Sequence, residues 1–121
     1  MNFQLQNLML RLYNTYMRNK IKNDPIVVMD EQHTLPKKAG NGILRYFLTV
    51  DNDGKLLRYS LAYINYQLHS SDNGRVIGYD NDHNYHHRHC MGVIEPVKFS
   101  SYEQILDQFE KEWRDYHERL K

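Results

Sequence analysis

Two aromatic-rich runs joined by the tetrapeptide DNDG constrain the fold of this chain most strongly. Residues 43–50 (ILRYFLTV) and 55–69 (KLLRYSLAYINYQLH) flank this turn, and Asp-Gly between such runs is typical of a β-hairpin. Alternate residues of the second run separate into an apolar face (Leu57, Tyr59, Leu61, Tyr63) and a mixed face (Arg58, Ser60, Ala62, Ile64). The pattern predicts a sheet with one face against a core.

Further strand-like runs extend this sheet on both sides. Residues 25–33 (PIVVMDEQH) precede the hairpin, and SSDNG forms a second turn before residues 75–81 (RVIGYDN). Residues 92–99 (GVIEPVKF) add an extended segment. Because the turns are short, strands that follow one another in the chain are predicted to pair as an antiparallel meander.

A helix is predicted at each end of the chain. Apolar residues recur at helical spacing over residues 3–22, and Asp24-Pro25 ends that helix. Residues 100–103 (SSYE) predict a capping box with Ser100 as the N-cap and Glu103 at the third helical position. The helix that follows carries one apolar stripe, made of Tyr102, Ile105, Leu106, Phe109, Trp113 and Tyr116.

The predicted fold is therefore α+β, an antiparallel β-meander of four to five strands flanked by N- and C-terminal helices. We expect both helices to cover one side of the sheet, with Ile105, Phe109 and Trp113 packed against strand residues such as Leu61 and Tyr63. A length of 121 residues suits a single domain. Its parts are a helical segment (1–23), a sheet with the histidine-rich motif (25–99) and a C-terminal helix (100–121).

The composition limits the class of protein. The chain has 16 Lys and Arg against 15 Asp and Glu, so binding to nucleic acid would need a local basic patch. Cys90 is the only cysteine, which excludes an internal disulfide and suits a reducing cytoplasm. The N-terminus lacks the features of a signal peptide, and no apolar run approaches the roughly 20 residues of a membrane span. We expect a cytoplasmic protein.

Residues 79–90 (YDNDHNYHHRHC) contain four of the seven histidines. Histidine changes charge near neutral pH, so a cluster of this kind suits acid–base chemistry. Cleavage of RNA through its own 2′-hydroxyl needs a base, an acid and a cation that stabilises the phosphorane. In this interpretation His87 and His89 are the base and the acid, Arg88 is the cation, and Asp80 orients one imidazole.

The same cluster is open to other interpretations. His83, His87 and His89 are candidate ligands for zinc or another divalent metal, with Asp80 or Cys90 as a fourth. No Cys-x-x-Cys pair or His-Glu-x-x-His helix accompanies them, so the sequence contains no strong zinc motif. The acid–base interpretation needs no cofactor. The histidines would otherwise bind phosphate without catalysis, or lie in a solvated loop. Elsewhere, Lys37, Lys38, Arg45, Arg58 and Arg75 would form a phosphate-contacting surface if the sheet brought them together.

Residues 75–109 (RVIGYDNDHNYHHRHCMGVIEPVKFSSYEQILDQF) resemble the C-terminal half of the TumE family of prokaryotic toxins. The matching positions are Tyr79, Asp80, Asn81, His87, Arg88, His89 and Phe99. The resemblance extends over about residues 43–115 and leaves out the N-terminal helical segment. Many members carry Lys-Gly-Asp before the first motif histidine, where this chain has Asn84-Tyr85-His86.

The resemblance implies the toxin of a toxin–antitoxin pair, encoded beside a helix-turn-helix antitoxin. Together with the histidine cluster it favours a metal-independent endoribonuclease. The alternatives are a non-enzymatic nucleic-acid-binding regulator and a metal-dependent nuclease. The expected contacts to the RNA substrate are Arg58, Tyr79, Asn81 and His86. A wide apolar surface on the N-terminal helix predicts either a homo-oligomer or antitoxin interface, or a helix buried on two sides within one chain. The residues of this surface are Leu5, Leu8, Met9, Leu10, Leu12 and Tyr13.

Overall fold

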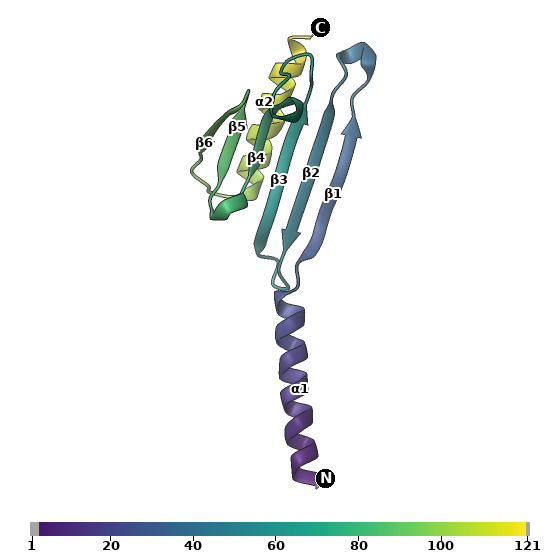
Figure 1. Ribbon diagram of the computed structural model, residues 1–121, viewed down its shortest axis with the longest axis vertical. Coiled ribbons are helices and arrows are strands. Elements are labelled where there is room, and N and C mark those ends of the chain that lie inside the picture. Colours follow the sequence, from purple (N-terminus) through teal and green to yellow (C-terminus); the bar gives the residue numbers. More distant parts are fainter. Residues whose placement is uncertain (1–2, 121) are drawn as a thin grey trace.

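The computed structural model describes residues 3–120 and contains one six-stranded sheet in which strand order follows chain order (Figure 1). Each strand is antiparallel to the next, and the strands are β1 (Ile26–Thr34), β2 (Ile43–Val50), β3 (Leu56–Ile64), β4 (Arg75–Asp80), β5 (His87–Cys90) and β6 (Val93–Pro96). Helices α1 (Phe3–Asn23) and α2 (Tyr102–Glu118) flank the sheet. The predicted α+β meander is confirmed. The strand beyond the expected four to five is β5, which forms inside the histidine cluster.

Helix α2 covers one face of the sheet and forms the core with it. Tyr59, Leu61 and Tyr63 on β3 are fully buried beneath the helix, as are Ile105 and Phe109 on α2 itself. The Trp113 ring is half-buried, with its centroid 5.9 Å from that of Tyr63. The predicted apolar face of β3 is therefore confirmed for Tyr59, Leu61 and Tyr63 but is wrong for Leu57, which is 43% exposed at a register shift between β2 and β3.

The start of α2 differs from the prediction by one residue. The N-cap is Ser101, whose hydroxyl accepts the backbone N–H of Gln104 at 3.1 Å. The hydroxyl of Ser100 donates instead to the Gln104 side chain. The assignment of Ser100 as N-cap is wrong because Ser101 is the residue whose hydroxyl reaches the N–H at the third helical position, as a cap must.

Helix α1 extends away from the sheet and covers neither face (Figure 1). Only two residues separate it from β1, so no loop turns it back toward the core. The prediction that both helices cover one side of the sheet is therefore wrong for α1. Its apolar side chains between Leu5 and Tyr13 are 46–62% exposed. Neither α1 nor α2 is long and apolar enough to cross a membrane, within the described residues.

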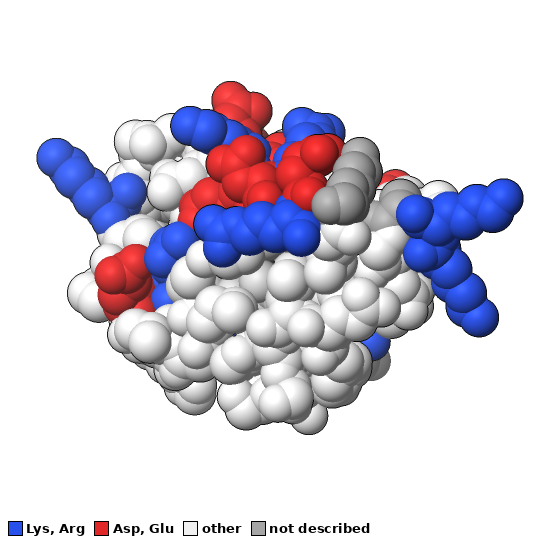
Figure 2. Space-filling view, turned by 90° about the horizontal axis from the view of Figure 1, so that it is seen from above, with Lys and Arg blue, Asp and Glu red and all other residues white. Residues whose placement is uncertain are grey.

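The arrangement leaves the second face of the sheet without a helix. The end of the molecule near the C-terminus carries acidic and basic side chains mixed along one side, while the opposite side is largely uncharged (Figure 2). No broad basic surface is visible in this view, in agreement with the net charge of +1. Any phosphate-binding site must therefore be local.

Candidate active site on the open face of the sheet

The β4–β5 hairpin places an aspartate and two histidines together on the open face. Asp80 pairs with His87, and Gly78 pairs with His89, in the register of the two strands. Paired residues of an antiparallel sheet point to the same side, so these side chains meet. Although no helix covers them, Asp80, His87 and His89 are only 3–6% exposed.

One carboxylate holds both imidazoles. His87 Nε2 donates to Asp80 Oδ1 at 2.7 Å, and His89 Nε2 donates to Asp80 Oδ2 at 3.0 Å. The second nitrogens have opposite kinds of partner. His87 Nδ1 faces the carbonyl oxygen of Tyr85 at 3.1 Å, whereas His89 Nδ1 faces the Arg75 guanidinium at 3.0 Å.

The two rings therefore have different hydrogen-bonding partners. Both nitrogens of His87 face oxygen acceptors, whereas His89 faces one acceptor and one donor. His89 accepts from Arg75 and donates to Asp80, so it is neutral. Burial lowers the pKa of His89 and the charge of Arg75 lowers it further, against the opposing effect of Asp80. The two imidazoles therefore share one carboxylate but differ in their other partner.

Arg75 reaches this cluster because of a register shift. Tyr63 pairs with Ile77 but Ile64 pairs with Arg75, so Val76 is an extra residue in β4. The bulge turns Arg75 onto the open face, where two nitrogens bond the carboxylate of Asp72 at 3.0 and 3.1 Å. A Cβ on Gly78 would lie 2.8 Å from Arg75 Cδ, so the glycine makes room for the arginine.

Arg88 lies on the other side of the same hairpin. Its Nε donates to Glu112 of α2 at 3.0 Å and its Nη1 to Glu95 at 2.9 Å. Burial opposes the charge of Arg88, but the hydrogen bond and charge of Glu112 outweigh it and raise the pKa of Arg88. Tyr79 is fully buried there and donates to Glu112. The predicted grouping of Arg88 with the histidines is not formed, because successive strand residues point to opposite faces.

The other predicted substrate contacts have different surroundings. Arg58 lies on the open face and pairs with Asp82 at 3.0 Å. Asn81 binds the β3 backbone, where its amide donates to the Leu57 carbonyl at 2.9 Å. His86 stacks on Phe99 with a centroid distance of 3.9 Å. Of the four residues predicted to contact substrate, Arg58 alone lies exposed beside the cluster.

The family described as Toxin TumE matches residues 14–117 of this chain, which include the whole sheet and nearly all of α2. The chain belongs to the TumE toxin family. The match begins within α1, so the exclusion of the whole N-terminal helix from the resemblance is wrong. No curated protein and no solved structure matches this TumE-family chain.

The TumE-family motif also places three groups that could bind a metal. Ligand atoms of Asp80, His87 and His89 lie within 4.8 Å of one another. The predicted set with His83 is not formed, because His83 is exposed in the turn Asp82–Asn84. Cys90 faces α2, with its sulfur 3.1 Å from the Tyr116 hydroxyl.

The donor set suits a divalent cation, but the position of Arg75 opposes one. Because Arg75 donates to His89 Nδ1, the Nε2 of His89 carries the proton and has no lone pair for a metal. The guanidinium also lies 3.9 Å from Asp80, where a second cation would be repelled. A bound metal would require Arg75 to move away from His89.

Sequence reasoning noticed Arg75 only as one basic residue among several. Regular alternation along β4 would place Arg75 with Ile77 and Tyr79 beneath α2. The bulge at Val76 reverses this, and the residues Asp72–Gly74 that precede it predict a turn but not a bulge. The only local signal is Gly78, whose missing side chain makes room for Arg75.

Proposed function

We propose that this chain is the toxin of a toxin–antitoxin pair and acts in the cytoplasm. In this proposal it cleaves RNA by a metal-independent mechanism, and its active site consists of Arg75, Asp80, His87 and His89. The observation that carries the proposal is that two histidines share one carboxylate while their second nitrogens face opposite partners, a carbonyl oxygen and a guanidinium. A cyclising cleavage of RNA requires a neutral base and a protonated acid at the same time. Pairs of titratable groups with opposed environments are a common mark of such sites.

The contacts suggest which ring has which role. A substrate phosphate would compete with His89 for the Arg75 guanidinium, since arginine binds phosphate in a bidentate manner. His89 Nδ1 would then be free to take the proton from the 2′-hydroxyl. The 2′-oxygen attacks the adjacent phosphorus, and the bond to the 5′-oxygen breaks. His87 Nδ1 gives its proton to that leaving oxygen, which yields a 2′,3′-cyclic phosphate and a 5′-hydroxyl.

Asp80 keeps the two rings in position during this transfer. It accepts an N–H from each Nε2, which leaves both Nδ1 atoms for the substrate. Tyr85 stacks on His87 with a centroid distance of 4.5 Å and is itself exposed. Access of the substrate to His87 therefore requires the segment around Tyr85 to move.

The test uses a pair of oligonucleotides that differ in one atom. Purified protein is incubated with a short RNA that it cuts and with the same RNA carrying a 2′-deoxy nucleotide at the cut site. We expect a 2′,3′-cyclic phosphate from the first and no cleavage of the second, with EDTA present throughout. Cleavage of the deoxy substrate would contradict the mechanism.

A metal-dependent nuclease is the second candidate, favoured by the convergence of Asp80, His87 and His89. It predicts loss of cleavage in EDTA, recovery on addition of one divalent metal, and cleavage of the deoxy substrate. Arg75→Gln should raise metal affinity in that case, because His89 Nε2 becomes available. Binding of RNA without any turnover would instead favour a non-enzymatic regulator.

We also propose that α1 binds the antitoxin, a helix-turn-helix protein encoded beside this chain. Leu8, Met9, Leu12 and Tyr13 are exposed on α1, and residues 1–23 contain basic but no acidic residues. Two copies of such a helix would bring like charges together, so an acidic partner suits it better than a second copy.

Co-expression with the neighbouring helix-turn-helix protein, followed by light scattering, tests the role of α1. The double variant Leu8→Glu, Leu12→Glu should lose the complex, whereas Asn14→Gln, which removes no apolar side chain and adds no charge, should keep it. A homodimer of the toxin alone that Leu8→Glu, Leu12→Glu disrupts would contradict the antitoxin assignment and favour an oligomer.

A further inference from the structure

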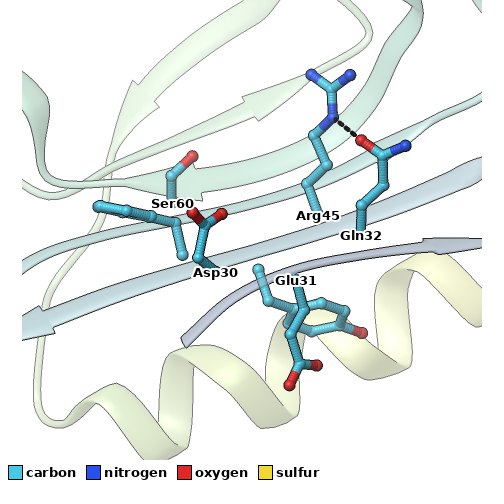
Figure 3. A pocket seen from close by; sticks show the side chains of 7 residues that line it. Asp30, Glu31, Gln32, Arg45 and Ser60 are labelled. Carbon is cyan, nitrogen blue, oxygen red and sulfur yellow. Dashed lines mark hydrogen bonds between the residues drawn. The ribbon is translucent and has the colours of Figure 1, made fainter. Parts of the chain in front are cut away.

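The open face continues from the histidine cluster toward β1 as a hollow of about 290 Å³. Asp30, Gln32, Arg45 and Ser60 project into it from the side away from α2, whereas Glu31 points to the opposite side (Figure 3). The register connects this hollow to the cluster through one row of paired residues, which are Asp30, Phe47, Ser60 and Asp80.

The surface between the histidine cluster and the hollow carries small side chains. Ser60 lies next to Asp80, and Ala62 lies next to Gly78, across β3 and β4. Arg45 follows Ala62 in that second row, on β2. An extended chain could therefore cross β4 and β3 over these small residues, alongside Ile64, which lines a hollow between Arg75 and Arg45.

Arg45 lies at the end of this path, and its charge is not paired with a carboxylate of the described chain. It lines the hollow and also a second one, which contains Asp72, Asn73 and Arg75. Its Nε donates to the amide oxygen of Gln32 at 3.1 Å. Within residues 3–120 no carboxylate pairs with Arg45, whereas Arg58, Arg75 and Arg88 each have one.

The chemistry of the hollow matches one nucleobase better than the others. The Asp30 carboxylate can only accept hydrogen bonds, and the Arg45 guanidinium can only donate them. Guanine presents two neighbouring donors, N1–H and N2–H, and also two neighbouring acceptors, O6 and N7. Adenine, cytosine and uracil each lack one of these two pairs. Phe47 supplies an aromatic ring beside the two polar groups, with the Arg58 guanidinium 5.7 Å from its centroid, and a base would stack on this ring next to Arg58.

We propose that this hollow binds a guanine of single-stranded RNA next to the phosphate held by Arg75. The inference rests on the proposed function, because it takes the histidine cluster as the place where the RNA backbone lies. Asp30 recognises the donor edge of the base, Arg45 its acceptor edge, and Phe47 its ring face. Base preference is thus separated from the acid–base groups by the width of β3.

The experiment measures binding without turnover. The full-length His87→Gln variant is titrated into fluorescent five-nucleotide RNAs that are uridine except for one central A, C, G or U. We expect the guanosine oligonucleotide to bind about tenfold more tightly than the others, from one bidentate base contact. Asp30→Asn should reduce this preference to about twofold or less, since an amide offers one acceptor instead of two.

Two further variants sharpen the test. Glu31→Gln removes the neighbouring carboxylate that points toward α2, and it should leave guanine preference unchanged. Arg45→Gln should also reduce the preference for the guanosine oligonucleotide, because the amide cannot donate two hydrogen bonds to O6 and N7 in the manner of a guanidinium. Equal affinity for the four RNAs, or an unchanged preference in Asp30→Asn, would overturn the inference.

The outcome is separable from that of the proposed function. Guanine-selective binding by a protein that never cleaves RNA would keep the subsite and remove the ribonuclease. Cleavage to a cyclic phosphate with no base preference, at cut sites unaffected by Asp30→Asn, would keep the ribonuclease and remove the subsite. Failure of the His87→Gln variant to bind any of the RNAs would also overturn the subsite, with cleavage by the unmodified protein tested independently.

Discussion

The two faces of strand β5 use the same kinds of side chain for different purposes. On the face beneath α2, Arg88 binds the carboxylates of Glu112 and Glu95. On the open face, Arg75 binds Asp72 but also touches His89, whose ring shares Asp80 with His87. Both faces hold an arginine beside acidic groups, yet only on the open face does the arginine contact a histidine that shares a carboxylate with another histidine.

The contrast shows how a four-residue strand separates stability from chemistry. Arg88 ties β5 to α2, and the helix closes over it. His87 and His89, on either side of Arg88 in the sequence, point to the side that no helix covers. Alternation alone produces this division. The contrast predicts that damage to the two faces should have different consequences, and four experiments examine this.

The largest expected effect is loss of cleavage when either histidine of the open face is replaced. His87→Ala and His89→Ala should each lower the cleavage rate by about 10²–10⁴-fold and abolish growth arrest, because each removes one proton-transfer partner. Circular dichroism should show a folded protein in both. His83→Ala, in the exposed turn, is the control and should remain toxic. Full toxicity in a folded His87→Ala, His89→Ala double variant would exclude the catalytic role.

Replacement of each of the two arginines by glutamine tests the contrast between the two faces most directly. Arg75→Gln should lower the cleavage rate by about 10²-fold, as for loss of one donor to transition-state charge. Its effect on thermal stability should be small. Arg88→Gln should do the reverse and lower the free energy of unfolding by about 1–3 kcal/mol, because it leaves Glu112 partly buried without its partner.

Lysine variants add a check on the same pair. Arg75→Lys should recover only part of the activity, because the bidentate contact to phosphate is lost. If Arg88→Lys instead behaves as an activity variant with unchanged stability, the assignment of the two faces is reversed.

Asp80→Asn should give a smaller defect than loss of a histidine. The amide retains the shape of the carboxylate but donates where one imidazole needs an acceptor, so one ring loses its orientation. Partners that orient a functional histidine typically contribute about 10–100-fold. Cleavage rate and thermal melting should be measured together. A rate equal to that of the unmodified protein would show that Asp80 has no orienting role.

The smallest expected effect is a change of stability with pH. The pKa of His89 in the folded protein lies below its ordinary value of 6.5, so the unfolded chain binds more protons as pH falls through that value. The free energy of unfolding should therefore be constant above about pH 6.5 and decrease below it. Thermal melting at several pH values would show this. His89→Gln should weaken the decrease, whereas His83→Gln should not.

Much of the fold follows from patterns that act over a few residues. Period-two alternation in β3 assigned Tyr59, Leu61 and Tyr63 to the core, and the apolar stripe of α2 supplied their partners. The direction of α1 was not predictable in this way. Its apolar residues indicate a helix that buries a surface, but they do not say whether that surface meets the same chain or another one.

The candidate site was predicted only in part, because local spacing identifies some of its residues and not others. The spacing of His87 and His89 places both on one side of a strand, and the hairpin adds Asp80. Arg88 was grouped with them by proximity in sequence, which is misleading in a strand. The position of Arg75 on the open face depends on a bulge that could not be predicted from the residue types around it. Side chains that meet through a change of register cannot be found from local spacing.

The meander has a consequence for the order in which the molecule forms. All five strand pairings join neighbours in the chain, so contacts are short in sequence and the sheet can grow one strand at a time. During synthesis β1, β2 and β3 emerge first and can pair at once. The histidine hairpin follows, and α2 closes the other face last. A nascent chain thus acquires the Asp80, His87 and His89 cluster only after the first three strands have been able to pair.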